Sequence, residues 1–376
     1  MYPPPLSKHQ IVETPVLRRG GSRGVPTMAL ALVVLLSLAM SATLSTAHAA
    51  PSEFRYKTFK VPTADSEPRY ITEGPDGNLW WVAGAEVFTP NPDPDTGGTF
   101  TSNIGRTTPA GASTEFEVNC NGCLFDDIAS GPDNTLFVSS NSAGLWTITT
   151  SGVIGFVLPV RADGTEVGYS LGALTSDGDD LWGSATDIIW RYDVPTGEFT
   201  EFAVPGAVGE VGVDADGIVW FAAIGAIGRF DPANPGSAVI TPVFTPDQQP
   251  ANVISLAVAS DGNVWFTDRF NHVVGFLDPA TNTGTSFFTP TPESGPQDVA
   301  AGADGSVWFT QARVGNVARV TSAGVFTEAG KAIGDDPRSG LEDALGVAFR
   351  SARAGQAESV WWTMQAANKI GTVSAR

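Results

Sequence analysis

Short runs of β-branched and aromatic residues, each preceded by a turn of the Asp-Gly type, recur along the chain. The clearest run is Asp-Gly-Ser-Val-Trp-Phe-Thr at residues 304–310. In each run Leu or Val precedes an aromatic residue. These aromatics lie 38 to 57 residues apart: Trp80, Phe137, Trp182, Trp220, Trp265, Trp308 and Trp361. A repeat of this length indicates a solenoid, an array or a propeller.

Each repeat predicts four short strands. An apolar first strand precedes the turn, and the aromatic second strand follows it. Sequences such as Ile-Gly-Arg at 104–106 mark the third strand. The fourth strand is marked by Phe after a further turn, and we expect it at 115–118, 156–158, 201–204, 243–245, 287–289 and 326–328. Four-stranded units of about 40–50 residues are typical of propeller blades.

The last repeat lacks a fourth strand, because the chain ends at residue 376 just after the third. Residues 54–62 resemble the fourth strands of the other repeats, so we expect the N-terminal strand to complete the last blade. Closure of this kind leaves no open sheet edge. The prediction is an all-β fold, a single seven-bladed β-propeller domain over residues 51–376. The repeated aromatics then fill the wedges between neighbouring sheets.

Residues 1–50 predict a cleavable signal peptide and leader. Arg18, Arg19 and Arg23 precede the apolar run 28–40, and small residues follow at 47–50. The apolar run is short for a transmembrane helix, although an uncleaved anchor is the alternative. Export by the general or by the twin-arginine route is left open. We therefore expect a secreted, extracellular protein with no membrane insertion after cleavage.

Composition and charge are consistent with this interpretation. The chain has 42 Gly, 27 Pro and 10 Trp with 16% charged residues, as expected for many strands joined by tight turns. Residues 1–50 hold four of the 21 basic and one of the 40 acidic residues, so the remainder carries a net charge of −22. Such a charge repels nucleic acid and anionic membranes, and it also simply favours solubility. We expect a monomer with no nucleic-acid partner.

The two cysteines form the sequence Cys-Asn-Gly-Cys at 120–123. Asn-Gly favours a tight turn, which brings Cys120 and Cys123 close enough for a disulfide. An exported protein favours the oxidised form. A redox motif would be expected between a strand and a helix, and a zinc site would need further ligands. We expect a small structural disulfide.

The residues that begin each first strand differ from blade to blade, and ligands of such rings usually bind there, around the central axis. Aligned on the repeated aromatics, the first of these start positions holds Arg69, Asp126, Leu171, Gly209, Ile254, Gln297 and Leu345. The second holds Tyr70, Asp127, Gly172, Glu210, Ser255, Asp298 and Gly346. The candidate ligand-binding residues are Arg69, Tyr70, Asp126, Asp127, Glu210, Gln297 and Asp298.

The acidic side of this rim admits several ligands. Carboxylates around a polar channel suit Mg²⁺ or Ca²⁺, and Glu342 and Asp343, just ahead of the last pair, are candidate metal ligands. The same acids suit polyols or amines, or they simply belong to a solvated channel mouth that contains an Arg-Asp pair. The cysteine pair and the insertion 84–102 fall on this side too, and elaborated loops favour binding there.

Residues 68–81 read Pro-Arg-Tyr-Ile-Thr-Glu-Gly-Pro-Asp-Gly-Asn-Leu-Trp-Trp, followed by Asn-Ile-Gly-Arg at 103–106 and Thr-Glu-Phe at 114–116. Trp-Phe-Thr recurs at 265–267 and 308–310, and Asn-Lys-Ile-Gly stands at 368–371. This pattern resembles the virginiamycin B lyase (streptogramin lyase) family over essentially the whole chain after residue 50. It is more specific for the repeat than for the reaction.

The resemblance implies a seven-bladed propeller that opens a cyclic depsipeptide at its ester by elimination, using Mg²⁺ and a histidine base. The family's histidines follow Pro at first-strand starts of late blades. Here Gln297 follows Pro296 and Leu345 follows Ala344, so neither can act as the base. The family's metal carboxylate is matched by Asp343.

Beyond residue 50 the only histidine is His272, a weak candidate for a displaced base and, alternatively, a surface-loop residue. Two function classes follow. The first is a family-like propeller that binds a small molecule, peptide or glycan without the histidine-dependent elimination. The second is a metal-dependent enzyme, either a C–O lyase of the streptogramin B type or a lactonase-like hydrolase.

Overall fold

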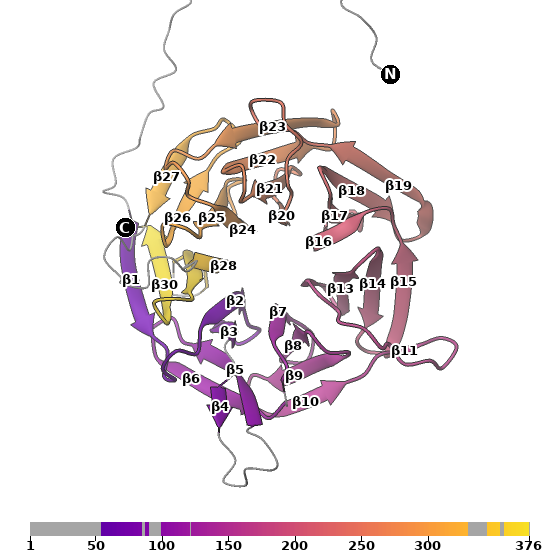
Figure 1. The fold of residues 1–376 in the computed structure, drawn as a ribbon, viewed down its shortest axis with the longest axis vertical. Coiled ribbons are helices and arrows are strands. Elements are labelled where there is room, and N and C mark those ends of the chain that lie inside the picture. Colours follow the sequence, from indigo (N-terminus) through magenta and orange to yellow (C-terminus); the bar gives the residue numbers. More distant parts are fainter. Residues whose placement is uncertain are drawn as a thin grey trace, which may run out of the picture. The chain divides into compact units, whose positions relative to one another are not determined.

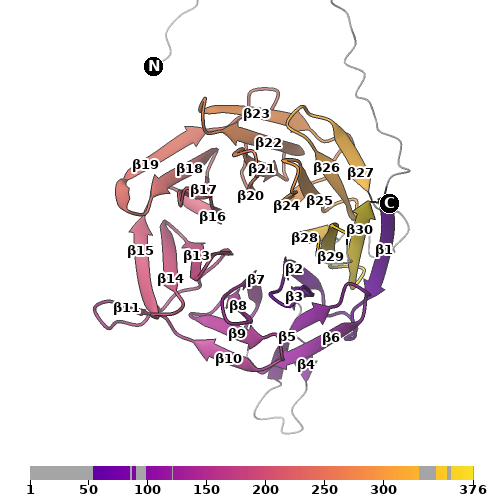
Figure 2. The same cartoon turned by 180° about the vertical axis from the view of Figure 1, so that it is seen from behind.

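The structure is a computed structural model that describes residues 54–84, 87–89, 99–120, 122–329, 344–353 and 357–375. These residues form seven sheets, which are antiparallel apart from one short added strand. Figure 1 shows the sheets around a common centre, and Figure 2 shows the same ring from behind. The inner strands of neighbouring sheets contact one another all the way round, including β28 against β2. The predicted seven-bladed propeller is therefore confirmed.

Blades 1 to 3 follow one another along the chain. Blade 1 contains β2 (Pro68–Glu73), β3 (Leu79–Ala83), β5 (Thr99–Thr107) and β6 (Ser113–Val118), with the added β4 (Val87–Thr89) paired to β5. Blade 2 contains β7 (Phe125–Ser130), β8 (Thr135–Ser140), β9 (Leu145–Thr149) and β10 (Ile154–Val157). Blade 3 contains β12 (Leu174–Asp177), β13 (Asp180–Ala185), β14 (Ile188–Asp193) and β15 (Glu198–Ala203), with the added β11 (Val160–Arg161) parallel to β15.

Blades 4 to 7 complete the ring. Blade 4 contains β16 (Ala207–Val213), β17 (Val219–Ala223), β18 (Ala226–Asp231) and β19 (Asn234–Pro242). Blade 5 contains β20 (Ser255–Val258), β21 (Val264–Asp268), β22 (Val273–Asp278) and β23 (Thr283–Phe288). Blade 6 contains β24 (Pro296–Ala301), β25 (Val307–Gln311), β26 (Asn316–Val320) and β27 (Phe326–Ala329). Blade 7 contains β28 (Ala344–Arg350), β29 (Ser359–Met364), β30 (Lys369–Ala375) and β1 (Phe54–Lys60).

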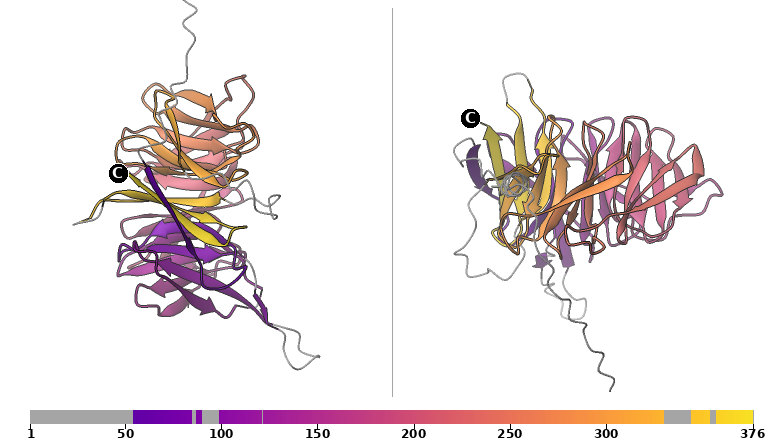
Figure 3. Two further views of the ribbon diagram at one scale, coloured as in Figure 1. Left: turned by 90° about the vertical axis from the view of Figure 1, so that its left-hand side faces the viewer. Right: turned by 90° about the horizontal axis from the view of Figure 1, so that it is seen from above.

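The two ends of the described chain meet in blade 7. β1 pairs antiparallel with β30, from Phe54 opposite Ala375 to Lys60 opposite Lys369. Figure 3 shows β1 in indigo beside the yellow strands of this blade. No helix in the described part of the chain has the length and hydrophobicity needed to span a bilayer.

The seven repeated aromatics pack as wedges between blades, as predicted. Each belongs to a buried cluster that includes residues of the next blade. Trp220 of blade 4, for example, packs with Leu256 and Phe266 of blade 5. Large rings at these positions remove much apolar surface from water, which is the main favourable term in folding.

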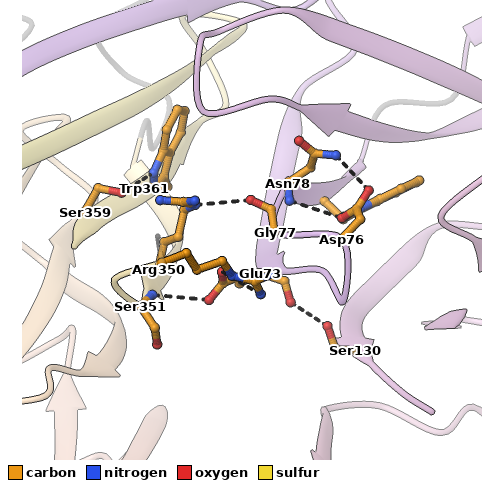
Figure 4. A network of polar contacts seen from close by, with 11 residues as sticks. Glu73, Asp76, Gly77, Asn78, Ser130, Arg350, Ser351, Ser359 and Trp361 are labelled. Carbon is orange, nitrogen blue, oxygen red and sulfur yellow. Dashed lines mark hydrogen bonds and ion pairs between the residues drawn. The ribbon is translucent and has the colours of Figure 1, made fainter. Parts of the chain in front are cut away.

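The Asp-Gly turns lie at the opposite ends of the first strands from the start positions. Gly77 and Gly305 have φ angles of 75° and 77°, a left-handed conformation that favours glycine. At the junction of blades 7 and 1 a polar network spans this turn face (Figure 4). Arg350, 2% exposed, donates from Nε to the carbonyl of Gly77 at 3.1 Å. Glu73 accepts hydrogen bonds from Ser351 N and Arg353 Nε.

One strand prediction was wrong. The fourth strand of blade 4 was expected at 243–245, but β19 is Asn234–Pro242. Val243 is buried after the strand ends, and Phe244 forms only an isolated bridge with Pro250. β19 pairs with β18 through a register shift, and most of its residues are exposed. An exposed outer strand lacks the apolar alternation by which a strand is recognised.

Candidate functional site

The inner strands are irregular where they start. In five blades the pairing of the first strand with the second shifts register at this end, between Pro68 and Ile71 in blade 1 and between Pro296 and Val299 in blade 6, for example. Each shift places extra residues on the first strand, as in a β-bulge. The start positions predicted from the sequence fall at these irregularities, where a strand can redirect its side chains.

The start positions surround one cavity of about 220 Å³. Its lining comes from six blades: Arg69, Tyr70, Asp126, Asp127, Gly172, Ala173, Gly209, Glu210, Ile254, Gln297 and Asp298. All seven residues predicted as ligand-binding candidates are in this lining. The alignment of the repeats thus brought together residues up to 229 positions apart, from Arg69 to Asp298.

Two other cavities are larger, but neither gathers the start positions. One, of about 270 Å³, lies between blades 6 and 7 beside Trp308, and its charged lining includes the ion pair of Asp304 with Arg319. The other, of about 580 Å³, lies along β1 beside Arg55 and Lys57. We take the central cavity as the candidate site because its polar side chains differ from blade to blade.

Carboxylates of blades 2, 4 and 6 join their own blade to the next one. Asp127 accepts the backbone N–H of Leu174 at 2.9 Å. Glu210 accepts that of Leu256 at 3.2 Å, and Asp298 accepts that of Val347 at 2.7 Å. A charged acceptor strengthens such a bond. These acids therefore have a structural role in addition to any role in binding.

Glu210 and Asp298 share one hydroxyl group. Ser255, 1% exposed, lies with Oγ 2.6 Å from Oε2 of Glu210 and 2.9 Å from Oδ1 of Asp298. One hydroxyl hydrogen cannot make two full hydrogen bonds, so the pair is best satisfied when one carboxyl is protonated. Burial, with the charges of Asp298 and Asp127, raises the pKa of Glu210 well above its usual range. Burial raises the pKa of Asp298 to about 6.

The other acids of the cavity are also shifted. Burial raises the pKa of Asp127 to about 7, against the opposing effect of its backbone hydrogen bonds. Burial raises the pKa of Asp126 as well, while Ser170 and Arg69 oppose the rise. The pKa of Tyr70 is raised by burial and then by the surrounding carboxylates, so its phenol stays protonated. The cavity therefore holds hydrogen-bond donors as well as acceptors near neutral pH.

Arg69 lies in this acidic cavity, where burial raises the pKa of its neighbour Asp126 and the charge of Arg69 lowers it. Among the described residues its guanidinium forms no hydrogen bond or ion pair, and its Nε is buried. Its neighbour Asp126 accepts instead from Ser170 Oγ at 3.2 Å. Gln297, the candidate of blade 6, accepts from Arg269 Nη1 at 3.0 Å. Arg269 was not predicted, because it comes from the loop between β21 and β22.

Hydroxyl groups of the second strands were also missed. In five blades the residue two positions after the repeated aromatic is Ser or Thr: Ser139, Ser184, Thr267, Thr310 and Thr363. Each hydroxyl donates to a start-position carbonyl of the next blade, and the first four bonds measure 2.5 to 2.8 Å. Blades 1 and 4 have Val82 and Ala222 there. The recurring Thr of Trp-Phe-Thr was the available signal.

His272 lies on the same face but outside the cavity lining. It precedes β22 with φ 57°, and its Nδ1 accepts the backbone N–H of Gly295 at 3.3 Å. Burial lowers its pKa, with a further lowering by Arg313. The ring is therefore neutral near pH 7 and fixes the neighbouring loop.

The described residues do not fit a metal ion. Among them no group of three or more His, Cys, Asp or Glu side chains is arranged to hold one. Both oxygens of Asp127 and of Asp298 already accept hydrogen bonds. The candidate metal ligands Glu342 and Asp343 lie outside the described residues. No step through a metal follows from this geometry.

Cys120 and Cys123 form a disulfide, with their Cα atoms 5.6 Å apart. The bridge lies between β6 and β7, and both cysteines pack with the buried cluster around Trp80. Ser102 donates from Oγ to the carbonyl of Cys123 at 2.7 Å. The disulfide therefore fixes the connection that leads into the start positions of blade 2.

Comparisons with known proteins agree with the repeat pattern. The sequence model of the virginiamycin B lyase family matches residues 197–376. Among curated protein sequences, none matches the chain. A streptogramin B lyase structure has 20% identity and a TM-score of 0.69, covering 87% of this chain and all of that one.

Two structures of virginiamycin B lyase from Staphylococcus aureus are similar. The selenomethionine-substituted enzyme has 20% identity, and a catalytically inactive variant with quinupristin has 21%. Each has a TM-score of 0.66 and covers 86% of this chain and 99% of its own. Likeness at this identity concerns the fold alone. The chain thus resembles the virginiamycin B lyase family, by sequence over residues 197–376 and by its seven-bladed fold.

Proposed function

We propose that this protein is an exported propeller that binds a small molecule, a peptide or a glycan in the central cavity, without the histidine-dependent elimination of the family it resembles. The proposal includes cleavage of the leader near residue 50, so that the mature chain begins just before β1 and closes the ring. The N-terminal sequence of protein recovered from culture medium tests this part.

One observation carries the binding proposal: six blades contribute unlike side chains to a single cavity. A cavity with a few convergent polar groups is the usual form of a small-molecule site. The lining includes Arg69, whose guanidinium has no hydrogen bond or ion pair within the described ranges, and the carboxyl pair of Glu210 and Asp298, which shares the hydroxyl group of Ser255. A ligand that forms hydrogen bonds with these side chains would supply partners that they lack in the free protein, which favours binding.

Two observations argue against the family's elimination. The residues that follow the pattern of its histidines are Gln297 and Leu345, and neither titrates as a base near neutral pH. His272 is held by Gly295 outside the cavity lining. The alternative remains a Mg²⁺-dependent C–O lyase or a lactonase-like hydrolase, favoured by the sequence match over residues 197–376 and by Asp343.

Ring opening of a streptogramin B, with and without Mg²⁺, separates these functions. Mass spectrometry distinguishes the two reactions, because elimination leaves the total mass unchanged and hydrolysis adds one water. We expect intact substrate in both conditions. Opening without a mass change that requires Mg²⁺, and that is lost in His272→Ala or Asp343→Ala, would establish the lyase instead.

Binding itself is tested by thermal unfolding in the presence of small molecules, peptides and glycans. A ligand at 100 times its dissociation constant stabilises the folded state by about 2.7 kcal/mol. We expect a shift that disappears when Arg69 or Glu210 is replaced. A stabilising ligand whose effect survives both replacements binds elsewhere, which would contradict the assignment of the site.

A further inference from the structure

Arg69 is an unusual residue for a cavity of this charge. Its side chain packs across the backbone of Gly84, where an added Cβ would lie 2.2 Å from the arginine Cδ. Some other arginines of the ring form ion pairs, such as Arg161 with Glu201 at 2.8 Å and Arg353 with Glu73 at 3.1 Å. Its Nε is buried without a hydrogen bond among the described residues, which is costly, and Arg69 lines the central cavity, where a group on a ligand can contact it.

The chemistry of that group follows from the guanidinium. Its planar set of donors matches a carboxylate, which it binds through two parallel hydrogen bonds. The phenol of Tyr70, which lines the same cavity from the adjacent position, is a second donor. The carboxylates of the cavity do not already satisfy Arg69, since it forms an ion pair with none of them within the described residues.

The acids of blades 4 and 6 favour a positively charged group on the same ligand. Within the described residues Oε1 of Glu210 accepts no hydrogen bond, while Oε2 accepts from Ser255 and Leu256. Asp298 shares Ser255 with Glu210. A ligand ammonium beside these carboxyls would donate a hydrogen bond to Oε1 of Glu210. Its positive charge would also compensate the negative charge that the two carboxyls gain when they lose their protons.

We propose that the ligand of the central cavity is a zwitterion of the amino-acid type, with its carboxylate on Arg69 and Tyr70 and its ammonium on Glu210 and Asp298. The inference rests on the proposed function and names the class of its ligand. A simple cation would leave Arg69 unpaired and be repelled by it. A simple anion would be repelled by the carboxylates. A cavity of about 220 Å³ has room for a molecule of this size.

Isothermal titration calorimetry of the protein expressed from the full-length sequence tests the inference. The probes are the free L-amino acids, and for the tightest of them its N-acetyl derivative and its carboxamide. Hydrogen bonds to charged groups contribute about 1.5–3 kcal/mol, so we expect each capped form to bind at least about tenfold more weakly. Arg69→Gln should remove the discrimination against the carboxamide. Glu210→Gln should remove the discrimination against the N-acetyl form.

Matched controls replace exposed residues outside the cavity lining: Arg55→Gln for the arginine and Glu166→Gln for the acid. Both should bind like the unaltered protein. Arg69→Lys keeps the positive charge and is the second variant if Arg69→Gln does not fold, as judged by thermal unfolding. It should bind more weakly but still prefer the free carboxylate.

The outcomes separate the two proposals. Equal binding of free and capped amino acids, or binding in the cavity of an unrelated compound but of no amino acid, overturns the zwitterion and leaves the proposed function standing. Failure of every small molecule, peptide and glycan to bind overturns both. Discrimination that is unchanged in Arg69→Gln and Glu210→Gln also overturns the assignment of the two charges.

Discussion

The two faces of the ring are built from the same strands, yet their residues repeat very differently. On the turn face equivalent residues form the same hydrogen bond in different blades. Asp76 accepts the backbone N–H of Asn78, and Asp261 accepts that of Asn263. On the channel face the pair of start positions differs between blades, except that blades 3 and 7 both carry Leu-Gly. The comparison teaches that positions shared by the repeats maintain the blades, whereas those that differ form the site. In a repeat protein, binding residues are found where the repeat is broken.

The turn face also contains the junction of blades 7 and 1, and the largest expected effect lies there. Arg350→Ala should lower the free energy of unfolding by about 3 kcal/mol, because it removes a buried side chain and leaves the Gly77 carbonyl unpaired. Urea unfolding measures this loss. Ligand binding by the folded fraction should be unchanged, since Arg350 does not line the central cavity.

Arg353→Ala is the matched control at the same junction. Arg353 forms an ion pair with Glu73, but its side chain is 45% exposed. Exposed ion pairs contribute little, so we expect a loss below about 1 kcal/mol. Equal losses in the two variants would mean that burial of Arg350 adds nothing to closure of the ring.

The next effect compares two turns of the same sequence type. Asp76 and Asp261 each accept from the Asn two residues later, but only Asp76 also accepts the indole N–H of the following tryptophan, Trp80, at 3.0 Å. The indole nitrogen of Trp265 is buried without a partner. Asp76→Ala should therefore destabilise the protein by about 1 kcal/mol more than Asp261→Ala.

Urea unfolding of both variants and of their double mutant measures this difference. The two sites lie in different blades, so their effects should add. A loss in Asp261→Ala as large as that in Asp76→Ala would show that the aspartate acts only through its turn. The supposed equivalence of the turns would then be complete, and the contrast with the channel face would be stronger.

The sequence allowed the ring and the polar lining of the central cavity to be predicted, because both follow from the repeat. The wedge aromatics and all seven candidate residues of the cavity were found by alignment of the blades. The outer strand β19 was misplaced because its exposed residues carry no apolar alternation. Side-chain partners were not predictable: Ser255 lies between Glu210 and Asp298 through contacts between blades, which no local pattern reports.

The smallest expected effect tests the channel face. In Glu210→Gln the amide oxygen can take the place of Oε2 and keep the bonds to Ser255 and Leu256, while the amide nitrogen takes the place of the unpaired Oε1. Little stability should be lost at acid pH, because the raised pKa of Glu210 favours its protonated form, which the neutral amide resembles. The variant therefore changes the charge of the cavity with little change in its packing.

The pH dependence gives the sign. The pKa of Glu210 is raised in the folded state above its ordinary 4.5. At pH values between the unfolded pKa and the folded pKa, the folded protein therefore binds more protons than the unfolded chain. Its contribution then makes the unaltered protein less stable as pH rises, together with Asp298 and Asp127, whose pKa values are also raised. Glutamine does not titrate, so the stability of Glu210→Gln relative to the unaltered protein should increase from about pH 5 to about pH 8. Urea midpoints across this range measure the difference, and Glu166→Gln, at an exposed acid, should give a curve parallel to that of the unaltered protein. A parallel curve for Glu210→Gln as well would contradict the raised pKa of Glu210. The carboxyls of the channel face would then be charged at no cost in stability, like the exposed acids of the turn face.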